Sequence, residues 1–439
     1  MRPMNMCNQG ATVVPIRDEE SGSSIKTRER FSVVSHVICL LKEIGIEDHR
    51  KLVHSIKVGI ALVLVSLLYL LQPLYHRVGE NAMWAIMTVV VVFEFTAGAT
   101  LSKGLNRGIG TILGGGLGCL AALLAQILAQ KAGRTGRAIA ICISVFIFGA
   151  AATYYRLIPS IKKKFDYGFL VFILTFNLVA VSGFRGEQII KLAGKRLSTI
   201  TMGFLICVFT SLFVFPVWAG DELHRSLVSK FDKLALSIEE CLKEYFQETE
   251  GKPEGQASTH LNSYKSVLHS KAADEALANF ARWEPWHGKF GFSYPWSKYL
   301  RIGELLRELA ASVLTLRECL QSHQQSPLCL RLIAKEPCEE MGTQICSTLR
   351  ELSDDIFKMR KFRRQESIFQ SDTLQTTGQE LHSVMRAFVQ GTLASKNGDV
   401  GDLYPIATFV FMLMEMVYKV ERLIKEVEEL GDPAGFRSQ

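Results

Sequence analysis

The side chains with the clearest chemical potential are basic residues that interrupt or border long apolar runs. Arg107 and Lys103 lie between two such runs, Lys57 precedes the first run, and Lys195 and Arg196 precede the last. Ionisable groups near or within a bilayer are costly and usually face a cavity or a pathway. A basic lining favours anions, and arginine adds planar, bidentate recognition of carboxylates. The pattern predicts a path for a small, multiply charged carboxylate, although each residue alone could instead be an interfacial anchor.

Charge is distributed unevenly along the chain. Residues 52–220 contain 15 Lys and Arg but only four Asp and Glu, a net charge of +11, whereas residues 221–439 have a net charge of −5. An excess of one sign sets the electrostatic potential along a pathway. The one acid deep in an apolar run is Glu94. It predicts either a proton carrier or, as we favour, a structural ion pair with a basic residue.

Six long runs with few charges must position these side chains. A helix needs about 20 apolar residues to cross the hydrocarbon of a bilayer. The runs meet or approach this length and cover residues 58–75, 81–102, 108–130, 138–155, 167–184 and 197–218. Continuous apolar runs exclude a barrel, and six buried helices of a soluble protein are the less favoured alternative. The predicted fold class is all-α, with a cytosolic segment (1–51), a six-span transmembrane helical bundle (52–220) and a cytosolic helical domain (221–439).

Basic residues near the ends of the runs predict the orientation of this multi-pass membrane protein. With the N-terminus in the cytoplasm, the inside segments hold 12 Lys and Arg and the outside loops hold eight. This bias places both termini in the cytoplasm. Tyr75, Trp84 and Trp218 near run ends are expected to be interfacial anchors.

The third run is rich in glycine at a regular spacing. Gly110, Gly114 and Gly118 are each separated by four positions, and Gly104 and Gly108 have the same spacing. Such G-x-x-x-G pairs allow helix backbones to approach closely. The spacing does not match the nucleotide-binding pattern G-x-G-x-x-G, because the required positions hold Leu113 and Cys119.

The second half of the chain changes character after Trp218. Apolar residues recur every three or four positions, which predicts amphipathic helices at about 221–249, 302–320, 338–364, 375–395 and 404–430. The apolar part of the last helix, residues 405–414, is only ten residues long. This length suits a buried core helix better than a seventh span.

No constellation typical of an enzyme is present in the sequence. The motifs G-x-S-x-G, H-E-x-x-H and Walker A are all absent, and the ten histidines do not cluster at metal-binding spacing. We therefore expect no enzyme activity, no metal site, no cofactor and no nucleic-acid partner.

Several linked motifs carry a resemblance to a known family. They are GENAMWAIMTVVVVFEF at residues 79–95, GATLSKGLNRG at 98–108, FDYG at 165–168, SGFR at 182–185, RLST at 196–199, PVWAG at 216–220 and WEPWHG at 283–288. This set resembles the plant aluminium-activated malate transporters. The matches extend from about residue 47 to residue 300.

The resemblance implies a homodimeric anion channel with six spans per subunit and a cytosolic helical domain. It implies conduction of malate and, variably, of chloride, nitrate, sulfate or fumarate through a basic pore. Arg107 and Arg196 match positions of the family's motifs, and Lys103 and Lys57 are weaker matches. Trp283, Glu284 and Pro285 form the family's W-E-P motif, which we expect to be structural, with a regulatory contact as the alternative.

The activating ion in the family name is not expected to act on this chain. Hard cations bind several oxygen ligands, mainly carboxylates, and the predicted outside loops offer only Glu80 and Glu187. The resemblance also implies modulation by GABA near the end of the sixth span, where Phe213 and Phe215 lie. We favour lipid-facing or packing roles for these two rings.

Two other functions remain as alternatives to a passive anion channel. A proton-coupled exporter of organic acids would need Glu94 as its titratable group. A membrane scaffold would leave the basic excess unexplained. The resemblance is compatible with the plasma membrane, which we favour, or the vacuolar membrane.

Overall fold

The chain is almost entirely helical wherever its structure is described. The computed structural model describes residues 49–71, 82–182, 189–246, 263–288, 290–291, 294–321, 326–361, 364–394 and 403–436. Residues 57–439 form one unit by their contacts. No strand is found in these ranges beyond an isolated bridge between His287 and Phe290. The all-α fold class is confirmed.

The first group of helices corresponds to the predicted apolar runs. It consists of α2 (His49–Leu70), α4 (Ala82–Val92), α5 (Ala97–Leu157), α6 (Pro159–Ser182) and α7 (Ile189–Phe213). Four segments in this group are long and apolar enough to cross a membrane: Lys51–Leu68, Ala97–Leu128, Gly133–Leu157 and Pro159–Ser182. Two shorter apolar helices accompany them, Met83–Val92 and Leu197–Phe213. The predicted count of six spans therefore stays a prediction.

The boundary between the second and third runs differs from the prediction. Helix α4 ends at Val92, and α5 begins at Ala97 and continues through the third run without the break expected near residue 105. Thr96 has extended backbone and caps α5, because its side chain accepts a hydrogen bond from the backbone N–H of Ala99. Threonine is favoured at this position. With 11 residues, α4 spans only about 16 Å.

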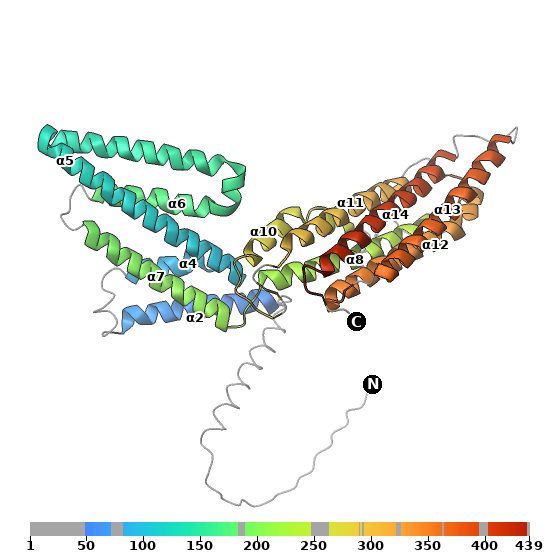
Figure 1. The fold of residues 1–439 in the computed structure, drawn as a ribbon, viewed down its shortest axis with the longest axis horizontal. Helices are drawn as coiled ribbons and strands as arrows, with labels where there is room; N and C mark the ends of the chain where they lie inside the picture. Colours follow the sequence, from blue (N-terminus) through green and yellow to red (C-terminus); the bar gives the residue numbers. More distant parts are fainter. Residues whose placement is uncertain are drawn as a thin grey trace, which may run out of the picture. The chain divides into compact units, whose positions relative to one another are not determined.

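Helix α5 consists of two arms that meet at Gly133. This glycine has φ +68°, a backbone conformation that residues other than glycine rarely adopt. The two arms and α6 lie together in Figure 1 and share a small apolar cluster that includes Ala121, Ile141 and Phe176. The chain reverses direction at Gly133, so the second arm of α5 runs back beside the first.

The glycine stripe of α5 lies against α6, as its spacing predicts. A Cβ added at Gly110 would overlap the carbonyl oxygen of Gly168, and one at Gly114 would lie 2.7 Å from the carbonyl oxygen of Phe172. At Gly118 the added Cβ would lie 3.0 Å from Cβ of Val179. Close approach of the two backbones requires small residues at these positions.

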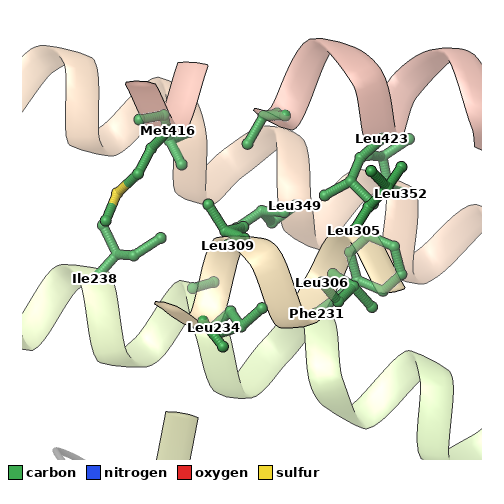
Figure 2. Close-up of a cluster of buried hydrophobic side chains, with 14 of the residues drawn as sticks. Phe231, Leu234, Ile238, Leu305, Leu306, Leu309, Leu349, Leu352, Met416 and Leu423 are labelled. Carbon is green, nitrogen blue, oxygen red and sulfur yellow. The ribbon is translucent and has the colours of Figure 1, made fainter. Parts of the chain in front are cut away.

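The second group of helices forms an amphipathic bundle. Its members are α8 (Ala219–Phe246), α9 (Ser263–Leu268), α10 (Lys271–Ala281), α11 (Trp296–Gln321), α12 (Leu328–Lys358), α13 (Arg364–Ala394) and α14 (Leu403–Gly431). Figure 2 shows how side chains of α8, α11, α12 and α14 meet in one core, with Phe231, Leu309, Leu349 and Met416 among them. Burial of such apolar surface stabilises this bundle.

Helix α14 is the one member of this bundle that is long and apolar enough to be a candidate span. One of its faces, however, is buried in the core of the bundle, including Phe409, Leu413 and Met416. A helix with one apolar face committed to soluble-type packing is amphipathic. This arrangement supports the prediction that the last helix is a core helix.

Candidate functional site

A cavity of about 280 Å³ lies among the helices of the first group. Trp84 of α4, Arg107 and Thr111 of α5, Thr175 of α6 and Ile200 of α7 contribute to its lining. Most of its lining is apolar, as is usual for small-molecule sites in which a few polar groups set the specificity.

Arg107 is the charged side chain among the described residues that line this cavity. It is only 7% exposed. Its Nη1 donates a hydrogen bond of 2.9 Å to the hydroxyl of Tyr167 on α6, while its buried Nε has no hydrogen-bond partner. No ion pair joins Arg107 to a carboxylate in the described part of the chain. A buried guanidinium without a counter-ion favours the approach of an anion.

The α5 helix positions Arg107 within this cavity. Arg107 lies almost three turns after the start of α5 at Ala97. Thr111, one turn later, donates from its hydroxyl to the backbone carbonyl of Arg107 at 2.8 Å. The two residues therefore share one face of the helix, and that face borders the cavity.

Lys103 forms an ion pair with Glu94 and does not join Arg107 in the lining of the cavity. The Nζ of Lys103 donates to Oε1 of Glu94, and both side chains are about one-third exposed. Glu94 lies in the four-residue break between α4 and α5, where its backbone N–H donates to the hydroxyl of Thr100 at 3.0 Å. In the structure the partner of Glu94 is Lys103, and its role as a structural group instead of a proton carrier stays a prediction.

Lys57 lies elsewhere and has a different partner. It is fully buried, and its Nζ donates to the backbone carbonyl of Phe215 at 3.4 Å. That carbonyl follows the end of α7 at Phe213. A cation at the C-terminal end of a helix is electrostatically favourable. In the described structure Lys57 therefore contacts the end of α7 and not the cavity.

Lys195 and Arg196 lie in α7, but their side chains are outside the described part of the structure. Their sequence neighbours Gly194 and Leu197 line the cavity. Arg196 lies one helical turn before Ile200, which also lines it. Glu80 and Glu187 of the predicted outside loops lie outside the described residues.

The structure gives contacts within the protein for two of the tryptophans expected as interfacial anchors, and the anchoring role stays a prediction. Trp84 contributes to the lining of the cavity. Trp218 stacks on the ring of His287 with centroids 3.8 Å apart. Sequence position alone does not distinguish an aromatic ring at a membrane surface from one that packs inside the protein. Tyr75 lies outside the described residues.

The W-E-P motif follows the end of α10 at Ala281. Glu284 is 5% exposed, and its carboxylate accepts hydrogen bonds from the backbone N–H groups of Ala219 (2.6 Å), Gly220 (3.0 Å) and Gly98 (3.2 Å). Burial raises the pKa of Glu284, and these N–H donors oppose the rise. Trp283 is partly exposed, and the carbonyl of Pro285 is 2.9 Å from Nδ1 of His287.

The fold and the cavity define a class of protein before any relative is considered. Four apolar helices line a cavity that contains a buried arginine with no carboxylate partner among the described residues, and two of them, α5 and α6, have segments long enough to span a membrane. This combination is typical of a helical membrane protein that handles anions.

Comparisons with known proteins identify the family. The family described as "Aluminium activated malate transporter" matches residues 42–397. The chain belongs to this family and is a membrane protein. Because this is a family of transporters, the prediction that the chain is not an enzyme is confirmed.

Individual relatives agree with this assignment. The chain is 44% identical over 391 residues to "Aluminum-activated malate transporter 14" of Arabidopsis thaliana, covering 88% of this chain and 71% of the relative. It is 42% identical over 408 residues to "Aluminum-activated malate transporter 2" of the same plant, covering 91% and 78%. A wheat (Triticum aestivum) protein, "Aluminum-activated malate transporter 1", is 44% identical over 315 residues, covering 70% and 68%.

Proposed function

We propose that this protein is an anion channel that conducts malate, and also chloride and nitrate, across a plant membrane. The observation that carries the proposal is the position of Arg107, which is buried beside a cavity and has no carboxylate partner in the described structure. A malate dianion offers two carboxylates, each able to accept charge-assisted hydrogen bonds from a guanidinium. The names of the relatives support malate as the substrate.

The relatives support malate as the transported substrate. The cavity and Arg107 support a channel mechanism. Among the described residues, the cavity combines the guanidinium of Arg107 with a mostly apolar lining that includes the hydroxyls of Thr111 and Thr175. Such a lining favours anions and needs no second, coupled ion. The proton-coupled alternative would require Glu94 to release and take up a proton. In the structure Glu94 is paired with Lys103 and is not among the described residues that line the cavity, which favours a structural role.

The remaining parts of the proposal rest on the sequence. We propose a homodimer in contact with membrane lipid, located in the plasma membrane with both termini in the cytoplasm. The bundle from α8 onward is then cytosolic. Phe213 and Phe215, near which modulation by GABA would act, are each about 70% exposed and suit contact with lipid.

The function is tested by whole-cell current with malate as the main internal anion. Arg107→Ala is compared with wild type and with Arg156→Ala as a matched control. Arg156 also lies in α5, but it is paired with Asp166 at 2.9 Å and does not contribute to the cavity. We expect a malate current that Arg107→Ala reduces or makes less selective and that Arg156→Ala preserves. A current indifferent to Arg107→Ala would contradict the assignment of the site.

A further inference from the structure

The carboxylate of Glu284 lies at the first turns of two helices that are far apart in sequence. Its Oε1 accepts from Gly98 at the start of α5 and from Ala219 at the start of α8, and its Oε2 accepts from Gly220. The first N–H groups of a helix have no partner within the helix. A negative charge there is favourable because of the helix dipole. One side chain thus satisfies donors of both helices.

The surroundings of this carboxylate are too tightly packed for the contact to be incidental. A Cβ added at Gly98 would overlap the carbonyl oxygen of Phe280 and lie 2.8 Å from Cγ of Glu284. A Cβ added at Gly220 would lie 2.8 Å from the ring of Trp296. Glycine at position 98 therefore allows the end of α10 to approach the start of α5, and glycine at position 220 allows Trp296 at the start of α11 to pack against the start of α8.

The helix that Glu284 holds is also the helix that carries Arg107. Gly98 precedes Arg107 by nine residues on α5, which is about 13 Å along the helix axis. No break in helical geometry lies between them, since the one non-helical residue inside α5 is Gly133. A shift of the first turn of α5 is therefore transmitted along the helix to the arginine at the cavity.

A second connection between the same two groups of helices differs in its burial. Lys163 of α6 donates to Glu275 of α10 at 2.8 Å, and the side chain of Lys163 is 69% exposed. Exposed pairs of this kind contribute little. The backbone bond from Ala97 N–H to the carbonyl of Val217, at 2.9 Å, remains when Glu284 is changed. Loss of the Glu284 carboxylate therefore loosens the start of α5 without removing every contact there.

We propose that Glu284 is a positioning residue for the anion site, which links the C-terminal bundle through the first turn of α5 to Arg107. The inference rests on the proposed function, because it concerns anion selection at the same cavity. Movement of α8 and α10 in the bundle is transmitted through this carboxylate to the orientation of α5. The W-E-P motif thereby acquires a role in function beyond local folding.

The test measures the malate-to-chloride permeability ratio from reversal potentials, which does not depend on how many channels reach the surface. Variants Glu284→Ala, Glu284→Gln and Glu275→Ala are compared with wild type. We expect Glu284→Ala to change the ratio about threefold or more. Glu284→Gln keeps a carbonyl acceptor but places an amide donor near Gly220, so its change is smaller. Glu275→Ala keeps the wild-type ratio.

Other results would overturn the inference in distinguishable ways. If the Glu284 variants lower the current but keep the wild-type ratio, the residue only stabilises the fold. If Glu284→Ala does not reach the surface, the isosteric Glu284→Gln decides, and a wild-type ratio in that variant rejects the inference. A change of equal size in Glu275→Ala would show that the effect is not specific to Glu284. Absence of any anion current in wild type would instead reject the proposed function, and the inference with it.

Discussion

The guanidinium of Arg107 donates a hydrogen bond of 2.9 Å to the hydroxyl of Tyr167, joining α5 to α6 at the edge of the cavity. This bond occupies one of the five N–H donors of the guanidinium. The bond fixes the side chain in one orientation and leaves other donors available to an anion. Tyr167 therefore acts on the site by orienting Arg107.

Removing the hydroxyl of Tyr167 is expected to weaken malate binding. In Tyr167→Phe, Arg107 loses the contact that orients it, so we expect the malate concentration for half-maximal current to rise about threefold to tenfold. Concentration–current curves measure this change. Tyr154→Phe is the matched control, because Tyr154 is 67% exposed and does not contact Arg107. Equal curves for wild type and Tyr167→Phe would contradict the orienting role.

The ion pair between Glu94 and Lys103 predicts that Glu94 does not carry protons. In Glu94→Gln, we expect a malate current whose reversal potential still follows the malate gradient at every external pH. The reversal potential is recorded at external pH values below and above neutrality. Loss of a proton-dependent malate flux in Glu94→Gln would favour the coupled exporter.

External aluminium is expected to leave the current unchanged. The predicted outside loops contain two carboxylates, too few for the oxygen-rich shell that hard cations prefer. Recording before and after addition of aluminium at acidic external pH tests this. A several-fold increase in malate current would show that ligands come from elsewhere in the chain.

A buried charge cluster is expected to be essential for the stability of the C-terminal bundle. Asp274 is 2% exposed and accepts from Lys230 at 2.5 Å, Arg307 at 3.1 Å and Ser270 at 3.0 Å. Asp274→Ala leaves Lys230 buried without its carboxylate, which costs about 3–5 kcal/mol. We expect the apparent unfolding temperature of the purified protein to fall by several degrees.

The neighbouring residue provides the control for this measurement. Glu275 is the next residue of α10, but its partner Lys163 is exposed, so Glu275→Ala is expected to stay within about 0.5 kcal/mol of wild type. Similar unfolding temperatures for Asp274→Ala and Glu275→Ala would contradict the importance of the buried cluster.

Three cysteines of the bundle are expected to resist alkylation in the folded protein. Burial raises the pKa of Cys241, Cys338 and Cys346 to about 12 in each case. The thiolate is the reactive form, and an ordinary thiol with a pKa of about 8.5 ionises progressively as the pH rises from 8 to 9. Over this window the three buried groups stay protonated.

Peptide mapping after brief alkylation at pH 8 and pH 9 checks this prediction. We expect strong modification of these cysteines in denaturant and little in the folded protein at either pH. If the cysteines of the folded protein were alkylated as fast as those of the denatured protein, the result would contradict the burial of Cys338 and Cys346 in the packed core.

Much of the architecture could be predicted from the sequence, because apolar runs and three-to-four-residue periodicity follow directly from burial. The helices α8, α11 and α14 lie close to their predicted positions, whereas α12 begins at Leu328, before the predicted start near residue 338. The break between α4 and α5 could not be predicted from hydrophobicity, since Glu94 is the one charged residue between Asn81 and Ser102 and the apolar run continues on both sides of it. Thr96 followed by Ala97 was the available signal, because threonine favours helix N-caps.

The candidate site was predicted in part. The charge pattern identified Arg107, which lines the cavity. The sequence favoured Arg107 over Lys103 and Lys57, but it did not identify the partners of these two lysines in the structure, which are Glu94 and the carbonyl of Phe215. The contact of Glu284 with Gly98 joins residues 186 positions apart. No local pattern predicts a contact over such a separation.

The measurement that tests the central claim most directly is the reversal potential of wild-type current as the malate gradient is changed at constant pH. For a channel selective for a divalent anion, the account predicts a shift of about 30 mV for each tenfold change in the malate gradient. It predicts no comparable shift when the proton gradient alone is changed. A reversal potential that follows the proton gradient, or that ignores malate, would contradict the anion channel.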